Sequence, residues 1–226
     1  MIPIHDNNPT HRPPIVTVAL IVACVLIFFW QVSLGPRGAT AAVYSFGFIP
    51  ALLFTDASLP PELAVVPPSA TLFTSMFLHG SFMHLAGNML YLWVFGNNIE
   101  DVCGHGRFIV FYLLCGLAAA FTQALPNPES EVPMIGASGA ISGVLGAYLL
   151  LFPHARVRVL VPFFIFWVYE VPAGWLLGFW FVFQLLSGLG ADVSQGGVAF
   201  WAHIGGFVAG MALIFVFRDP RFKVGG

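Results

Sequence analysis

Long apolar runs, repeated along the whole chain, constrain the fold more than any other feature of this sequence. The runs are bounded by Pro, Gly or charged residues, and they reach or approach the roughly 20 residues that an α-helix needs to cross a bilayer core. Hydrophobic residues make up 58% of the 226 residues and charged residues only 8%, whereas about a quarter of the residues in a soluble domain are charged. The sequence therefore predicts an all-α membrane protein.

Six segments are predicted to be transmembrane helices. They cover residues 15–34, 72–97, 108–125, 136–152, 171–189 and 198–217. Together they make one membrane domain over residues 15–217, between an N-terminal segment (1–14) and a C-terminal tail (218–226). The first apolar run has no obvious small-residue cleavage site before it ends, so we expect a retained helix and not a signal peptide.

The basic residues predict the orientation of the helices. An even number of helices places both termini on one side, and Lys and Arg favour the cytoplasmic side. With the termini inside, only Arg37 lies in an outer loop, and the other basic residues are cytoplasmic: Arg12, Arg107, Arg156, Arg158, Arg218, Arg221 and Lys223. We expect a multi-pass protein with both termini in the cytoplasm, in a bacterial inner membrane, with an organelle membrane as the alternative.

Two connecting segments are too apolar to be ordinary solvated loops. The first outer loop, from Gly35 to about Ala70, contains "YSFGFIPALLF" and is predicted to lie in the membrane interface. The stretch "VRVLVPFFIFWVYEVP" before the fifth helix is predicted to be a cytoplasmic interfacial segment with uncertain ends.

Composition gives no indication of a cofactor, a metal or nucleic acid. The three cysteines are an odd number at spacings that fit neither disulfides nor a metal site. A net charge of -2 without a basic cluster gives no reason to expect a nucleic acid partner. The oligomeric state stays open.

Polar side chains inside the predicted helices are few and therefore informative, because polarity in a bilayer costs free energy. His84 and Asn88 are four residues apart and share one face of the second helix. His79, five residues before His84, lies off that face and is expected to have a rim or supporting role. The alternative is that His84 and Asn88 only hold helices together by hydrogen bonds.

Ser138 and His203 stand among small residues on two different helices. Glycines flank Ser138, and His203 is followed by Gly206 and Gly210 on its own face. Small residues let helix backbones approach closely, so the fourth and sixth helices can pack together and bring Ser138 within hydrogen-bond reach of His203. The alternatives are that Ser138 is only an N-cap and that His203 is only a packing residue.

Three motifs in this order resemble those of the rhomboid family of intramembrane serine proteases. They are "HGSFMHLAGN" on the second helix, "GASG" around Ser138 and "AHIGG" around His203. The resemblance extends from the first helix to the sixth and includes "FGFIPALLF" and "PAGWLLGFWFVFQLLSG". It implies that Ser138 is the nucleophile and His203 the general base.

The resemblance also implies the supporting residues. His84, Asn88 and the backbone N–H of Ser138 would form the oxyanion hole. Structural support would come from residues that keep the turn open or let helices cross: Gly136, Gly139, Gly206, Gly210 and His79. Asp192, eleven residues before His203, is expected in the last outer loop, so a serine–histidine dyad fits better than a triad.

Two positions depart from the pattern of the family. Ser142 stands four residues after Ser138, where family members often carry an aromatic ring that packs on the histidine. The first outer loop also lacks the Trp-Arg pair of some bacterial members. These departures leave the orientation of His203 and the docking of the loop open.

The predicted function is an intramembrane serine endopeptidase that cleaves transmembrane segments of other proteins. A helix protects its backbone carbonyls, so the substrate segment must unwind locally. The alternative is an inactive rhomboid-like protein that binds transmembrane clients, but such members usually lack the Ser or the His. A channel or carrier would need charged residues along several spans, and none is apparent.

Overall fold

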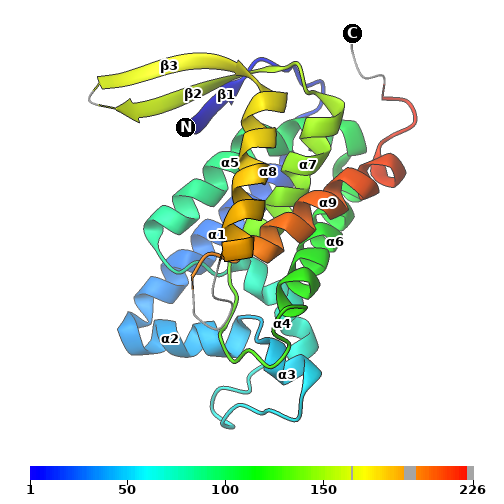
Figure 1. The fold of residues 1–226 in the computed structure, drawn as a ribbon. Coiled ribbons are helices and arrows are strands. Elements are labelled where there is room, and N and C mark those ends of the chain that lie inside the picture. The colour runs from blue at the N-terminus through cyan, green and yellow to red at the C-terminus, as the bar shows by residue number, and fades with distance from the viewer. Residues whose placement is uncertain (164, 191–196, 223–226) are drawn as a thin grey trace.

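The computed structural model describes residues 1–163, 165–190 and 197–222, which form a helical bundle with a small sheet at one end (Figure 1). The strands are β1 (Ile2–Asp6), β2 (Arg156–Phe163) and β3 (Ile165–Pro172). The helices are α1 (Ile15–Ser33), α2 (Gly35–Phe46), α3 (Pro50–Phe54), α4 (Pro68–Thr74), the 3₁₀ turn η1 (Ser75–Phe77), α5 (Phe82–Cys103), α6 (His105–Ala124), α7 (Ser138–Leu151), α8 (Ala173–Gly190) and α9 (Phe200–Phe217).

Four of the described helices, α1, α6, α8 and α9, are each long and apolar enough to cross a membrane. The predicted helical membrane fold is thereby confirmed. The count of six spanning helices stays a prediction, because α5 is less apolar and α7 has only 14 residues. At 1.5 Å per residue α7 is about 21 Å long, which is shorter than a bilayer core of about 30 Å.

Helix α7 occupies the centre of the bundle and is buried from Gly139 to Tyr148. It packs against α5, α6, α8 and α9. The crossing with α9 is very close: a Cβ atom added at Gly206 would overlap the carbonyl oxygen of Gly139, and one at Gly210 would overlap that of Gly143. Larger side chains at these positions would separate the two helices.

The predicted second helix differs from the structure at its start. Residues 72–97 are not one helix, because the chain forms α4 and η1, extends through Leu78 and begins α5 only at Phe82. Ser81 caps α5, its Oγ accepting a hydrogen bond from the backbone N–H of His84 at 3.1 Å. Apolar residues lie on both sides of the break. In the sequence, only Gly80 and the capping residue Ser81 indicated that a new helix begins here.

The first outer loop contains two short helices, α2 and α3, and it docks on the segment before α7. Phe48 is fully buried and forms a two-way backbone pair with Met134, with N···O distances of 3.0 Å and 2.7 Å. The backbone N–H of Ala51 also donates to the carbonyl of Ser130 at 3.0 Å. The loop therefore holds the segment that leads into Ser138, without the Trp-Arg pair.

The stretch before the fifth predicted helix, which was expected to be interfacial, forms a β-hairpin. The predicted all-α fold did not include this sheet. Strands β2 and β3 are antiparallel, and β1 adds to the other edge of β2, giving the order β1-β2-β3. Asp6 of β1 accepts a hydrogen bond from the Tyr148 hydroxyl of α7 at 2.6 Å. Burial raises the pKa of the Asp6 carboxyl above its usual range. The sheet is thus attached to the central helix.

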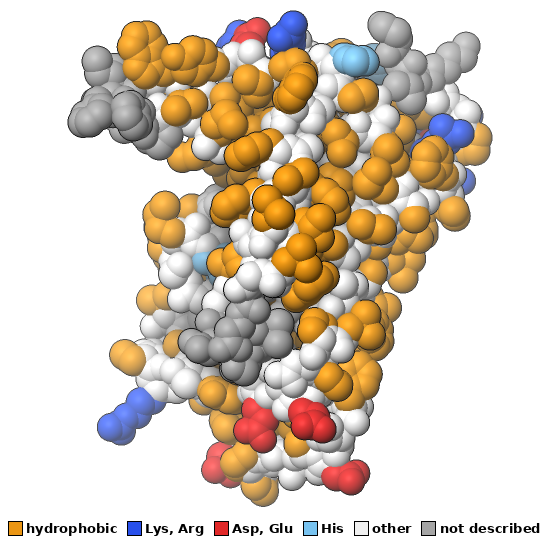
Figure 2. Space-filling view, in the orientation of Figure 1, with side chains coloured by type: hydrophobic (Ala, Val, Ile, Leu, Met, Phe, Trp, Pro, Cys, Tyr) orange, Lys and Arg blue, Asp and Glu red, His pale blue; other side chains and the backbone are white. Residues whose placement is uncertain are grey.

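Charged side chains gather at the two ends of the molecule, with an apolar band between them (Figure 2). The end that carries α3 shows mainly acidic side chains in this view, and most basic side chains lie at the opposite end, beside the sheet, where acidic side chains such as Asp219 and Glu170 pair with them. Most basic residues thus share one end of the bundle, and the assignment of that end to the cytoplasm stays a prediction. Lys223 lies outside the described residues.

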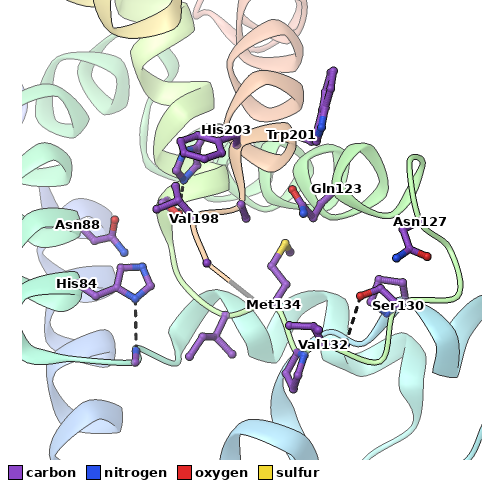
Figure 3. Close-up of a pocket in the computed structure, with 18 residues that line it drawn as sticks. His84, Asn88, Gln123, Asn127, Ser130, Val132, Met134, Val198, Trp201 and His203 are labelled. Carbon is purple, nitrogen blue, oxygen red and sulfur yellow. Dashed lines mark hydrogen bonds between the residues drawn. The ribbon is translucent and has the colours of Figure 1, made fainter. Parts of the chain in front are cut away.

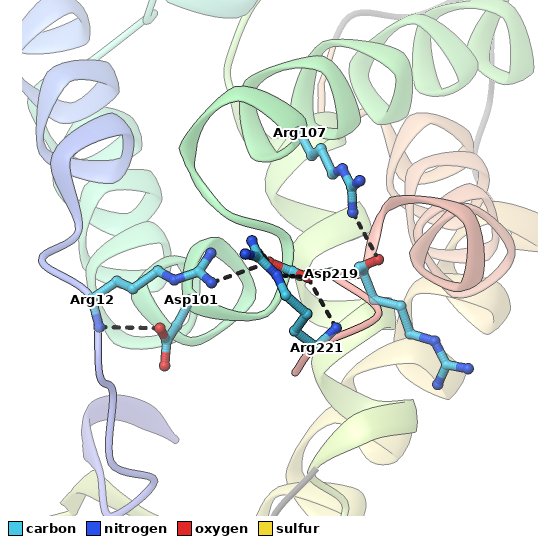
Figure 4. Close-up of polar contacts among 6 residues, drawn as sticks. Arg12, Asp101, Arg107, Asp219 and Arg221 are labelled. Carbon is cyan, nitrogen blue, oxygen red and sulfur yellow. Dashed lines mark hydrogen bonds and ion pairs between the residues drawn. The ribbon is translucent and has the colours of Figure 1, made fainter. Parts of the chain in front are cut away.

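A polar cluster ties the N-terminal segment to the end of α9 (Figure 4). Asp219 pairs with Arg221 at 2.9 Å and with Arg12 at 3.1 Å, and Asp101 accepts from the backbone N–H of Arg12 at 3.1 Å. The hydrogen bonds from Arg221, followed by that from Arg12, hold the pKa of the Asp219 carboxyl well below its usual range. The N-terminal segment and the residues directly after α9 are therefore fixed to the same end of the bundle.

Candidate active site

Ser138 and His203 meet across the close crossing of α7 and α9. Ser138 is the first residue of α7 and His203 lies in the first turn of α9. The distance from His203 Nε2 to Ser138 Oγ is 2.8 Å, and Figure 3 shows the imidazole pointing into a cavity. The helix crossing that the glycines predict thus brings the two side chains into a hydrogen bond.

Two residues of α8 fix the imidazole of His203. Gln184 Oε1 lies 2.8 Å from His203 Nδ1, and the ring of Trp180 lies 5.8 Å from that of His203, between ring centres. Because an amide oxygen only accepts hydrogen bonds, Nδ1 carries the proton and Nε2 keeps its lone pair toward Ser138. The aromatic neighbour of His203 thus comes from α8. It takes the place of the aromatic ring that many family members carry at the position of Ser142.

Sequence reasoning missed Gln184 and Trp180. A signal was present: Gln184 is a polar residue inside an apolar helix, and Trp180 is four residues earlier on the same face. Ser142 has a different role, since its Oγ donates to the carbonyl of Ser138 at 2.6 Å, within α7.

His84 and Asn88 face the start of α7 from α5. Asn88 Nδ2 is buried and has no hydrogen-bond partner among the described residues. His84 Nδ1 accepts from the backbone N–H of Gly80 at 3.4 Å, as drawn in Figure 3, so Nε2 carries the proton of the neutral ring. Two side-chain N–H donors are therefore available beside Ser138.

Gly136 allows these donors to approach the chain. Its φ of +122° is a backbone conformation that favours glycine, and an added Cβ would lie 2.8 Å from the His84 ring and 3.7 Å from Asn88 Nδ2. Gly139 serves the packing of α7, because its Cβ position lies 2.6 Å from the Cβ of Ala119 on α6. Glycine is therefore required at position 136 by the backbone conformation and the nearby donors, and at position 139 by helix packing.

His79 lies behind His84 and not in the cavity. Its side chain is buried, its ring centre is 5.1 Å from that of His84 in an edge-on arrangement, and its backbone N–H donates to Gln31 Oε1 at 3.1 Å. This position suits a residue that supports His84.

The cavity has a volume of about 530 Å³ and lies between α5, α7, α9 and the loop before α7. Its wall includes all four predicted polar residues, Ser138, His203, His84 and Asn88, together with Gln123. Asp192, the residue considered as a third member, lies outside the described residues. Among the described residues no group of three His, Cys, Asp or Glu side chains is placed to hold a metal ion.

Comparison with known proteins gives one family. Residues 69–220 match the Rhomboid domain. The chain is 33% identical to mitochondrial Rhomboid protein 1 of Saccharomyces cerevisiae over 141 residues, which is 61% of this chain and 38% of the yeast protein. It is 30% identical to the human mitochondrial presenilin-associated rhomboid-like protein over 166 residues, 66% of this chain and 40% of that protein.

A bacterial relative is similar over a shorter region. Rhomboid protease GluP of Bacillus subtilis is 42% identical over 78 residues, which is 34% of this chain and 15% of that protein. The chain spans 38% to 43% of the length of the first relatives that it matches. The domain match covers more than half of this chain and includes every residue of the site described above, so the chain belongs to the rhomboid family.

Proposed function

We propose that this protein is an intramembrane serine endopeptidase that works with a Ser138–His203 dyad. The observation that carries the proposal is the 2.8 Å contact between Ser138 Oγ and His203 Nε2 at the wall of a polar cavity within the bundle. The family includes serine proteases, and one relative is named a rhomboid protease. The contact is the one that a serine nucleophile and its general base require.

The first half of the reaction is acyl transfer to the serine. Ser138 Oγ attacks the carbonyl carbon of the scissile peptide bond while His203 Nε2 takes the hydroxyl proton. The C–N bond then breaks, and the imidazolium gives this proton to the departing amine. Gln184 keeps the other ring nitrogen protonated throughout, so the ring does not change its tautomer.

The second half is hydrolysis of the acyl-enzyme. A water molecule attacks the ester carbonyl as His203 takes one of its protons, and the same proton returns to Ser138 Oγ when the C–O bond breaks. The second fragment leaves as a carboxylic acid. Atoms balance with water as the only co-reactant.

Negative charge on the carbonyl oxygen is stabilised in both halves by three donors. These are Asn88 Nδ2, His84 Nε2 and the backbone N–H of Ser138. Asn88 Nδ2 already lies buried without a partner, and Ser138 begins α7, where a helix has unpaired amides. Donors that are fixed in advance stabilise the transition state without reorganisation.

The substrate class follows from the position of the site. Helix α7 is too short to cross the whole bilayer core, so its first residue lies below the membrane surface if its other end is level with the sheet. A substrate that reaches it is a transmembrane segment of another protein, unwound locally at weak helix formers.

The proposal does not name the cellular membrane that holds the protein, although the sequence suggested a bacterial inner membrane. The relatives include mitochondrial proteins of yeast and mammals as well as a bacterial protein, so the similarity does not support a bacterial inner membrane. The proposal is an integral membrane protein with both termini on the basic side.

The test is labelling of the purified protein with a fluorophosphonate, together with cleavage of a transmembrane test substrate. Ser138→Ala and His203→Ala should each abolish both signals, because one removes the nucleophile and the other removes its base. Ser33→Ala, which changes a serine at the far end of α1, should leave both unchanged. Cleavage by a folded Ser138→Ala protein would refute the mechanism.

A further inference from the structure

The β2–β3 hairpin carries an aromatic surface that the catalytic proposal does not use. The two strands have eight residues each, about 26 Å at 3.3 Å per residue. They project sideways from the end of the bundle where β1 lies (Figure 1), and Figure 2 shows this arm standing clear of the helices beneath it.

The register of the hairpin assigns each residue to one of two faces. Val157 pairs with Val171, Val159 with Tyr169 and Val161 with Trp167. Residues paired directly across antiparallel strands point to the same face. Val157 and Val159 are buried in the main core, at 0% and 1% exposure. The face that carries Trp167 and Tyr169 is therefore the one turned toward the bundle.

Trp167 and Tyr169 stay uncovered on the outer strand of the hairpin, although their partners across the strands, Val161 and Val159, pack on the core. They are 54% and 52% exposed, although they share a face with fully buried valines. The surface continues into α8, which begins directly after β3 and exposes Trp175 and Phe179 at 79% and 65%. The apolar side chains of the arm thus adjoin those of a helix that is long and apolar enough to cross a membrane.

The opposite face of the hairpin is charged near the bundle. Arg158 pairs with Glu170 across the strands, with an ion pair of 3.0 Å between half-exposed side chains. Arg156 lies on the same face as Arg158, two residues earlier, and Val168 opposite Leu160 is an aliphatic pair farther out. The charged groups point away from the bundle.

We infer that the β2–β3 hairpin is a membrane-interface arm, whose Trp167 and Tyr169 rest on the headgroup boundary of the bilayer beside α8. The bundle occupies the bilayer, so the face of the arm that is turned toward the bundle is turned toward lipid where it passes the bundle edge. Trp and Tyr are the residues enriched at that boundary, and basic residues mark the cytoplasmic side of it. The aromatic face contacts lipid and the charged face contacts water.

The test compares neighbouring positions on the two faces in nanodiscs that hold one copy of the full chain. The variants are Trp167→Cys and Val168→Cys, two positions that the protein itself leaves equally exposed, at 54% each. A cationic, water-soluble methanethiosulfonate is added, and modification is followed by the mass of the intact chain. The unsubstituted chain is the blank, because its three cysteines are buried.

The thiol at position 167 should react at least about tenfold more slowly than that at 168, since only the thiolate reacts and an apolar boundary disfavours it. Tyr169→Cys against Glu170→Cys is a second pair on the same strand and should show the same alternation. Each disc holds one protein chain, so a slow reaction at 167 and 169 reports lipid contact. Equal rates within both pairs, or slower reaction at 168 and 170, would overturn the inference.

Discussion

A neutral amide orients the imidazole at this site. Gln184 accepts from His203 Nδ1 at 2.8 Å, where a serine protease triad has a carboxylate. A carboxylate would also stabilise the imidazolium, but a charge inside an apolar helix costs several kcal/mol. The amide supplies the orientation without burying a charge, so we treat Gln184 as a positioning residue and not as a catalytic residue.

Gln184→Leu should lower kcat by at least about tenfold, because Nδ1 loses its acceptor and the other tautomer, which cannot take the serine proton, becomes accessible. KM should change little, since Gln184 is not part of the cavity wall. Gln184→Glu keeps an acceptor oxygen and should retain more kcat than the Leu variant. Steady-state kinetics on all three proteins decide this, and equal losses in the two variants would contradict it.

Asn88→Ala should lower kcat by about 100- to 1000-fold, the usual effect of removing one oxyanion donor. Thermal stability should change little, because Asn88 Nδ2 makes no hydrogen bond among the described residues. The matched control is Asn98→Ala on the same helix, where Nδ2 donates to the carbonyl of Asn8 at 3.0 Å. That variant should lose stability and keep its kcat. The reverse pattern would mean that Asn88 has a structural role.

At the scale of elements, helix α1 is capped by a side chain from another helix. Pro14 precedes α1 and offers no side-chain cap. Glu100 of α5 is fully buried and accepts from the backbone N–H groups of Val16 and Thr17, both at 2.8 Å, and from the Thr17 hydroxyl at 2.7 Å. The carboxylate satisfies amides that every helix start leaves unpaired and complements the positive end of the helix dipole.

Glu100→Ala should lower the free energy of unfolding by about 3 kcal/mol or more, because each buried donor left without a partner costs about 1–3 kcal/mol. Glu100→Gln keeps one acceptor oxygen and should lose less. Glu170→Ala breaks an exposed ion pair on the hairpin and should cost less than about 1 kcal/mol. Thermal unfolding in detergent measures all three, and a Glu100→Ala protein as stable as the parent would exclude the capping role.

At the scale of the whole molecule, the site exists because α7 and α9 cross at backbone contact. A Cβ atom at Gly146 of α7 would overlap the carbonyl of Phe207 on α9. Cβ atoms at Gly206 and Gly210 of α9 would likewise overlap backbone carbonyls of α7. At the other end of α9, the cluster around Asp219 fixes the residues that follow this helix to the N-terminal segment and to α5. The crossing therefore sets the distance between Ser138 Oγ and His203 Nε2.

Gly206→Ala should push α9 away from α7 and lower both kcat and stability, the latter by about 1–3 kcal/mol as is usual for an overpacked core. Gly178→Ala is the matched control on α8, because its added methyl group meets nothing within 4 Å. The control should keep its activity and lose no stability, since Ala is the better helix former. Cleavage assays and thermal unfolding on both variants test this, and full activity of Gly206→Ala would show that the close crossing is not needed.

By itself the sequence determined the membrane fold, the order of the motifs and four polar residues of the cavity wall, Ser138, His203, His84 and Asn88. These features are local patterns: apolar runs, the i,i+4 pair of His84 and Asn88, and the glycines near Ser138 and His203. Local patterns can be interpreted from sequence because helix periodicity places their residues on known faces. The family resemblance added roles to those residues.

Only the tertiary structure decided three further points. Gln184 and Trp180 reach His203 from a helix whose direction and rotation depend on packing against α9, which a single-helix pattern does not encode. The break before Phe82 lies between two apolar stretches, and its short polar signal at Gly80 and Ser81 did not by itself show that a new helix begins there. The sheet gains its third strand because β1, far away in sequence, pairs with the free edge of the β2–β3 hairpin, and pairing between distant segments leaves no local periodicity to read.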